Sequence, residues 1–137
     1  MAGLRIPYNC LVLVGDGEKA LFFRNHGDED HINLVVERVI EAELETVDDH
    51  GPIGSRDDVA AEASTEADFA RSIGRTLYQA AHSGLFDRLV IAAPPKVLGQ
   101  LRKEMHKEVS DRLIGEVPKT LTSHDVDDIQ RLLATKN

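Results

Sequence analysis

The sequence has little of what small proteins use to cross-link themselves or to enter membranes. It has one cysteine, Cys10, so no disulfide can form within the chain. It has no tryptophan, and aromatic residues make up only 4% of it. The N-terminal segment has no apolar run typical of a signal peptide, and no stretch approaches the roughly 18 apolar residues of a membrane span. We therefore expect a cytoplasmic protein without a membrane partner, and a core of aliphatic side chains into which Cys10 packs as a small hydrophobe.

Basic residues are also scarce relative to acidic ones. The chain has 24 Asp and Glu against 16 Lys and Arg, which gives a formal net charge of −8. Phosphate backbones attract basic proteins, so this balance argues against non-specific binding to nucleic acid. A length of 137 residues is that of one domain, spanning residues 1–137, large enough to bury a core without cross-links.

The first third of the chain predicts three strands joined by short turns. Residues 10–15 are a continuous apolar run, Asp16-Gly17 is a tight-turn signal, and residues 19–24 form a second strand. A third strand spans residues 32–44, and its length indicates a bulge or a strong twist. Alternation predicts that one of its faces is buried, namely the face with Ile32, Leu34, Val36, Ile40, Ala42 and Leu44.

Residues 45–64 lose this periodicity and predict a long, solvated acidic loop. A helix is expected to follow, with Thr65 and Asp68 as its N-terminal capping pair and Gly84 at its C-terminal end. Its buried face would carry Phe69, Ile73 and Leu77, which are spaced four residues apart.

The last third alternates strands and helices. Residues 86–93 predict a strand that Pro94-Pro95 ends, and the next helix is expected to end near Gly115. Residues 116–121 predict an edge strand, because Pro118 cannot donate to a ladder. The apolar stripes are Leu98, Leu101, Met105 and Val109 in the helix before this strand, and Val126, Ile129, Leu132 and Leu133 in a last helix capped by Thr122 or Ser123.

The resulting order β-β-β-α-β-α-β-α predicts an α/β fold with a mixed five-stranded sheet. Strands joined by short turns pair antiparallel, whereas strands joined through helices pair in parallel with right-handed crossovers. The simplest arrangement places the first strand in the centre, the meander on one side and the two later strands on the other. This is the topology of ribonuclease H-like folds.

No set of residues predicts catalysis. Asp16 ends the central strand, where ribonuclease H-like nucleases hold metal ions between two carboxylates. The fourth strand, however, ends in Ala92-Ala93, so Asp16 is expected to be a turn residue. The six histidines have no zinc-site spacing, and neither a dinucleotide fingerprint nor a phosphate-binding loop is complete. We expect no catalytic residue, metal or cofactor.

The helix after Pro95 predicts a local basic face over residues 96–107. On a helical wheel Lys96, Lys103 and Lys107 lie opposite the apolar stripe, and Arg102 lies at its border. Such a face suits an RNA backbone, the ribosome or an acidic protein partner. The alternative is an ordinary solvated helix with cations near its C-terminal end.

The segment AAPPKVLGQLRKEM, with LVGDGEKALFF, ADFARSIGRTL and EVPKTLT in the same order, resembles the host attachment protein family over roughly residues 9–134. That family is named for attachment of bacteria to host cells, and its members often carry an acidic residue where Thr120 stands. It is distantly similar to the middle domain of class-1 peptide chain release factors, whose fold agrees with the topology above. In those factors a Gly-Gly-Gln loop promotes peptidyl-tRNA hydrolysis; the corresponding residues 45–64 contain no glutamine.

Two functions follow as hypotheses. The first is a non-catalytic cytoplasmic interaction protein, implicated by resemblance in host attachment and associated with ribosomes or RNA. The second is a hydrolase of tRNA-linked or phosphate-containing substrates that uses Asp16, Arg56 and the 45–64 loop. A surface adhesin fits poorly without a signal peptide or disulfides, and the third strand suggests a homodimer formed through a sheet edge.

Binding residues are expected where the parallel strands end, because ligands of open α/β sheets favour that crevice. Pro94, Pro95 and Gly99 also have a structural explanation, in strand termination and close helix approach. The candidate binding residues are Asp16, Arg56, Pro94, Pro95, Lys96, Gly99, Arg102, Lys103, Lys107 and Lys119.

Overall fold

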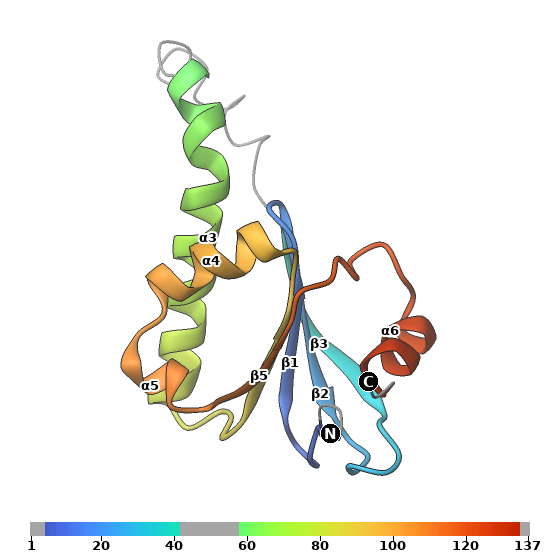
Figure 1. Cartoon of the computed structure of the whole chain (residues 1–137). Coiled ribbons are helices and arrows are strands. Elements are labelled where there is room, and N and C mark those ends of the chain that lie inside the picture. Colours follow the sequence, from blue (N-terminus) through green and yellow to red (C-terminus); the bar gives the residue numbers. More distant parts are fainter. Residues whose placement is uncertain (1–4, 42–57, 135–137) are drawn as a thin grey trace.

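The computed structural model describes the backbone at residues 5–41 and 58–134, and the side chains at 5–41 and 67–133 (Figure 1). A five-stranded sheet with the order β3-β2-β1-β4-β5 lies at its centre. β1 pairs antiparallel with β2 and β2 with β3, whereas β1–β4 and β4–β5 are parallel. The predicted mixed sheet with a central first strand is therefore confirmed. The strands are β1 Leu11–Gly15, β2 Lys19–Asn25, β3 Leu34–Glu41, β4 Leu89–Ala92 and β5 Leu113–Val117.

Helices cover both faces of the sheet. The helices α3 (Asp58–His82), α4 (Pro95–Glu104) and α5 (Lys107–Ser110) lie on one face, and α6 (Val126–Ala134) lies on the other (Figure 1). The N-terminal part of α3 extends past the end of the sheet at which β1 turns into β2. Of the helices that the structure describes, none is long and apolar enough to span a membrane.

Each face of the sheet has its own apolar core, because side chains alternate along β1. Leu11 and Leu13 pack with α3, α4 and α5, whereas Val12 and Val14 pack with α6. The predicted stripe of α3 faces the first core, and Cys10 is buried in the second. Burial raises the pKa of the Cys10 thiol to about 11, because the thiolate would lose its hydration.

The helix α3 begins earlier than the sequence predicts. Residues 58–64, expected as the end of the acidic loop, form its first turns, so Thr65 lies inside the helix and the predicted capping pair is wrong. The alanines of this segment are strong helix formers, which explains the longer helix. The rest of the predicted loop lies outside the described residues. Gly84 does end the helix as predicted, with φ 75° and a hydrogen bond from the Leu85 N–H to the Ala80 carbonyl.

The predicted single helix from Pro95 to Gly115 is broken. α4 ends at Glu104, Met105 adopts an extended conformation (φ −88°, ψ 123°), and α5 starts at Lys107. The break places the His106 ring 4.3 Å from the Tyr78 ring of α3 and lets Val109 reach the same core as Leu101. Gly115 consequently lies in β5, which spans residues 113–117 rather than 116–121; its position at the sheet edge is confirmed.

The third strand has the predicted bulge, but its predicted buried face is wrong. β2 pairs Phe22 with Arg38 and Phe23 with Val36, so Glu37 is an extra residue. The extra residue switches the faces: Leu34 packs on the α6 side, whereas Ile40 packs on the α3 side. Val36 is 51% exposed, because β3 is an edge strand that the helices only partly cover.

The last helix is capped by Asp125 instead of Thr122 or Ser123. The Asp128 N–H donates to the Asp125 side chain at 2.9 Å, and α6 starts one residue after Asp125. Ile129 and Leu133 enter the core as predicted, whereas Val126 is 37% exposed and is not a core residue.

Candidate functional site

The C-terminal ends of three neighbouring parallel strands meet at one edge of the sheet. Ala92 of β4 is opposite Val14 of β1 on one side and opposite Val117 of β5 on the other. A candidate residue follows two positions after each of these strand residues. The structure thereby brings together Asp16, Pro94 and Lys119.

Asp16 is held in place by the turn between β1 and β2 and by one distant side chain. One carboxylate oxygen accepts hydrogen bonds from the Glu18 and Lys19 N–H groups, both at 2.8 Å. The other accepts a hydrogen bond of 2.6 Å from the Thr122 hydroxyl. Burial alone would raise the pKa of Asp16, but the three hydrogen bonds outweigh it and hold the pKa below its usual value. Its expected role as a turn residue is confirmed.

A small pocket lies beside Asp16, between the end of β1 and the helices α3 and α4. Its walls are largely apolar, and Gln100 of α4 contributes an amide. None of the lining residues that the structure describes is a second acid, so nothing there pairs with Asp16 as a metal-binding or catalytic carboxylate. The lining residues are Leu13, Gly15, Asp16, Gly17, Ala20, Phe69, Ala70, Ile73, Val97, Gln100 and Leu101.

The two prolines make the turn from β4 into α4. Pro94 occupies the N-cap position in an extended conformation, and Pro95 is the first helical residue, where a missing N–H costs nothing. The Pro94 carbonyl accepts the first helical hydrogen bond, from the Leu98 N–H at 2.9 Å. Their structural explanation, strand termination, fits this geometry.

Gly99 does not have the structural role that the sequence suggests. A Cβ atom at this position would meet nothing within 4 Å, so close helix approach does not explain the glycine. Close approach occurs instead at Gly74 of α3, where a Cβ would lie 2.7 Å from the Glu104 carbonyl oxygen. Gly99 lies on α4 between Lys96, three residues before it, and Lys103, four residues after it, and these residues share one helix face.

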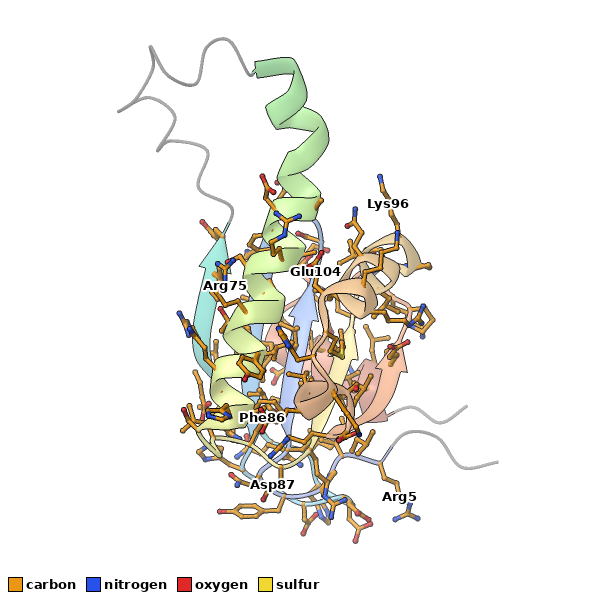
Figure 2. All side chains as sticks on the ribbon, turned by 90° about the vertical axis from the view of Figure 1, so that its left-hand side faces the viewer. Arg5, Arg75, Phe86, Asp87, Lys96 and Glu104 are labelled. Carbon is orange, nitrogen blue, oxygen red and sulfur yellow. The ribbon has the colours of Figure 1, made fainter. Side chains whose placement is uncertain are left out.

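Both lysines of this face are exposed, and Figure 2 shows Lys96 pointing away from the body of the protein at the start of α4. We call Lys96, Gly99 and Lys103 the α4 cationic face. A Gly in the interior of an exposed helix face costs about 0.5–1 kcal/mol relative to Ala. In the described part of the chain, no packing contact requires a glycine at position 99, so packing does not explain why this cost is tolerated.

Arg102 does not belong to the α4 cationic face, because it forms an ion pair with Glu116. Its guanidinium donates two hydrogen bonds to the Glu116 carboxylate of β5, one of them from Nε at 3.1 Å. These hydrogen bonds, helped by the charge of Glu116, raise the pKa of Arg102. Arg102 therefore fixes α4 to the edge strand, and its charge is largely compensated.

Lys107 does not belong to the α4 cationic face. The break at Met105 puts it on α5, where its amine donates to the Asp111 carboxylate at 3.0 and 3.1 Å. The predicted basic face over residues 96–107 is therefore wrong at its C-terminal end, because it assumed one continuous helix. Arg56 lies outside the described residues. Within the part of the chain that the structure covers, no three His, Cys, Asp or Glu side chains are grouped to hold a metal.

Three residues of this region were not anticipated from the sequence. Thr122 was expected as a helix cap, Gln100 only as a helix residue, and Glu116 only as a strand residue. Each of them contacts a group on another element. Thr122 donates to Asp16, Gln100 lines the pocket beside Asp16, and Glu116 accepts from Arg102. No local pattern could have indicated them.

Comparisons with known proteins give one family and a distant structure. The model of bacterial archaeo-eukaryotic release factor family 12 matches residues 9–133. The structure is similar to the crystal structure of the archaeal translation termination factor aRF1, with a TM-score of 0.47, 11% identity and coverage of 78% of this chain. The chain spans 29% of that protein. Among curated proteins no match is found. The predicted likeness to release factors is confirmed by the family, and the likeness to host attachment proteins stays a prediction.

Proposed function

Because the chain belongs to bacterial archaeo-eukaryotic release factor family 12, we propose that it is a non-catalytic binding protein of the translation machinery. Its partner is ribosomal RNA, and the contact surface is the α4 cationic face together with Lys119, which follows the end of β5. The observation that supports this most is a half-buried glycine, with open space where a Cβ would be, between two lysines on one helix face.

The chemistry of this face suits a phosphate backbone. Two ammonium groups provide point charges for phosphate oxygens, and the glycine between them leaves room for the backbone to approach the helix closely. Lys119 follows β5 at the same sheet end and is exposed. α4 begins there without an acidic residue in its first turn, so its N-terminal dipole is not opposed by a carboxylate in that turn.

The overall charge makes such binding local. With a net charge of −8, most of the surface repels RNA, and only a compact group of cations can attract it. The affinity should therefore be modest and should fall steeply with salt, since each neutralised phosphate releases a counterion.

The hydrogen bonds of Asp16 argue against a catalytic role for this residue. Its two oxygens accept three hydrogen bonds from the turn and from Thr122, which fits a fixed structural group better than a base that must exchange protons. The hydrolase hypothesis has no further support and is not proposed. An effect on attachment of bacteria to host cells, which the resemblance implies, would be indirect under this proposal.

Co-sedimentation with bacterial ribosomes at low and moderate salt tests the proposal. The wild type should pellet with ribosomes at low salt and be released as salt rises. A Lys96→Glu/Lys103→Glu variant should stay in the supernatant at both. If the variant pellets as the wild type does, or if the wild type never pellets, the proposal is wrong.

Lys107→Glu is the matched control for this experiment. It makes the same Lys-to-Glu change as each substitution of the double variant, and therefore half of its total charge change, but on α5, outside the α4 cationic face. The control should bind ribosomes nearly as well as the wild type. If the control lost half or more of the binding free energy that the α4 variant loses, binding would depend on net charge, which would contradict a defined surface on α4.

A further inference from the structure

The edge strand β3 exposes an unusual amount of apolar surface. Val36 and Val39 are each 51% exposed and Val35 is 40% exposed, whereas the neighbouring strand β2 is largely buried. Edge strands normally carry charges, prolines or covers that prevent pairing with another chain. Here the exposed valines surround one acidic and one basic residue, Glu37 and Arg38.

The central part of β3, residues 35–40, is complementary to itself when it is read in the opposite direction. Around the midpoint between Glu37 and Arg38, this holds for residues 35–40, where the acid faces the base and each aliphatic residue faces another; the outermost pair, Leu34 with the partner subunit's Glu41, does not follow it. An antiparallel copy would place Glu37 opposite the partner subunit's Arg38 and Val36 opposite the partner subunit's Val39. Opposite charges and β-branched pairs across strands are the pairs that stabilise antiparallel sheets.

The bulge makes this register possible. In a regular strand, residues 36 and 39 would point to opposite faces, and a two-fold pairing could not place them opposite each other. Because Glu37 is an extra residue, Val36 is opposite Phe23 and Val39 is opposite Leu21, and both of these side chains pack on the α6 side of the sheet. The two exposed valines therefore lie on one face, as the paired register requires.

On the other face of the sheet, residues 35 and 40 likewise lie on one side, as the paired register requires. Val35 is opposite Arg24 and Ile40 is opposite Ala20, and both pairs lie on the α3 side. Val35 would then meet the partner subunit's Ile40. Glu37 is already positioned there, because the Arg24 guanidinium donates to its carboxylate at 3.1 and 3.2 Å. Within the described part of the chain, Arg38 has no ion pair of its own, so it can meet the partner's acid.

The main-chain groups of β3 also fit. The Leu34 N–H donates to the Gln130 side chain of α6 at 2.6 Å, so it points to the free edge and away from β2. Successive residues of a strand direct these groups to alternate edges, and Val36 therefore presents its groups to the same free edge. Gln130 occupies only the start of the edge, which leaves residues 35–41 for pairing.

From these observations we infer that β3 forms a homodimer by antiparallel pairing with β3 of a second copy, with the two-fold axis between Glu37 and Arg38. The two sheets join into one continuous sheet of ten strands, since each copy contributes five. This inference does not depend on the proposed ribosome binding, which uses α4 and the C-terminal ends of the parallel strands and not β3.

Sedimentation equilibrium over about 1 μM to 1 mM protein, the range of weak to moderate contacts, tests the association. The wild type, 15.1 kDa as a monomer, should approach twice that mass as concentration rises. Val39→Lys should remain monomeric, because a buried ammonium would oppose pairing. Ile114→Lys, at a 39% exposed position of the other edge strand, should dimerise normally. A monomeric wild type throughout the range would overturn the inference, as would a dimer that Val39→Lys leaves intact.

Disulfide trapping tests the register. In the inferred dimer, residue 36 and the partner's residue 39 have Cα atoms about 5.5 Å apart, within disulfide range. Val36→Cys/Val39→Cys should therefore form a covalent dimer under mild oxidation, whereas either single variant should not. Cys10 is buried and should not interfere. Efficient dimers of a single variant would place the axis elsewhere and refute this register.

Discussion

Replacing Gly99 by alanine should stabilise the fold and weaken ribosome binding at the same time. The residue lies in the middle of α4, and a Cβ there meets nothing within 4 Å, so the added methyl has no steric cost. Alanine is about 0.5–1 kcal/mol more favourable than glycine in a helix interior. The expected gain for Gly99→Ala is therefore about 0.5–1 kcal/mol, or roughly 2–5 °C in Tm for a chain of this size.

Gly74→Ala is the matched control within the neighbouring helix. The same methyl would lie 2.7 Å from the Glu104 carbonyl oxygen, where it would force α3 and α4 apart. Overpacking of this kind typically costs 1–3 kcal/mol, which exceeds the gain in helix propensity. The two glycine-to-alanine changes should thus have opposite signs in urea unfolding at neutral pH.

The two readouts of Gly99→Ala separate the structural claim from the functional one. If the variant is not more stable than the wild type, then Gly99 does not have the open environment described above. If it is more stable and binds ribosomes with unchanged affinity, the α4 cationic face is not the contact surface. Only a variant that is more stable and binds ribosomes more weakly agrees with both the open environment of Gly99 and the contact through the α4 cationic face.

Other predictions concern single contacts. Removing the hydroxyl with Thr122→Val should cost about 1 kcal/mol at neutral pH, less than the roughly 1.5–3 kcal/mol of a buried hydrogen bond to a charged group, because the site is partly exposed. The folded-state pKa of Asp16 is lowered, so its contribution is present above the unfolded value of about 3.9 and lost as pH falls through the folded pKa. The stability gap between the wild type and Thr122→Val in urea should accordingly close in acid, and a gap independent of pH would contradict the assignment. Cys10, with a pKa of about 11 and a buried side chain, should react with a thiol reagent at pH 8 only in denaturant; rapid labelling of the native protein would disprove its burial. Asp125→Ala should lose about 1 kcal/mol through the missing cap of α6, measured by thermal unfolding, and an unchanged Tm would return the capping role to Thr122 or Ser123.

The order of strands could be predicted from the sequence because its signals are local. Continuous apolar runs and tight-turn residues such as Asp16-Gly17 set the strands and the antiparallel pairs, and the intervening helices dictate parallel pairing for the others. The end of α3 was equally accessible, because a glycine with positive φ has a sequence signature.

The break between α4 and α5 could not be predicted from periodicity. Leu98, Leu101, Met105 and Val109 keep helical spacing across it, and all four pack in the same core. The stripe is therefore identical for one helix or two. What accompanies the break is the tilted contact of the His106 and Tyr78 rings, which joins segments that are distant in sequence.

The same limitation applies to the site and to the faces of β3. Asp16 and Thr122 are separated by 106 residues, so their hydrogen bond becomes visible only once the loop before α6 is placed. In β3 the bulge was expected from length, but its position was not. Because one inserted residue exchanges the two faces, that uncertainty was enough to assign Val36 to the core.

The salt dependence of ribosome affinity, measured for the wild type and for Lys96→Gln/Lys103→Gln, tests the central claim most directly. Each lysine that contacts a phosphate contributes about 0.7–0.9 to the slope of log K against log salt concentration. The account predicts that the variant's slope is shallower by roughly 1.4–1.8, while Lys107→Gln leaves it unchanged. Equal slopes for the wild type and the α4 variant would mean that these lysines touch no phosphate, and would contradict RNA binding through α4.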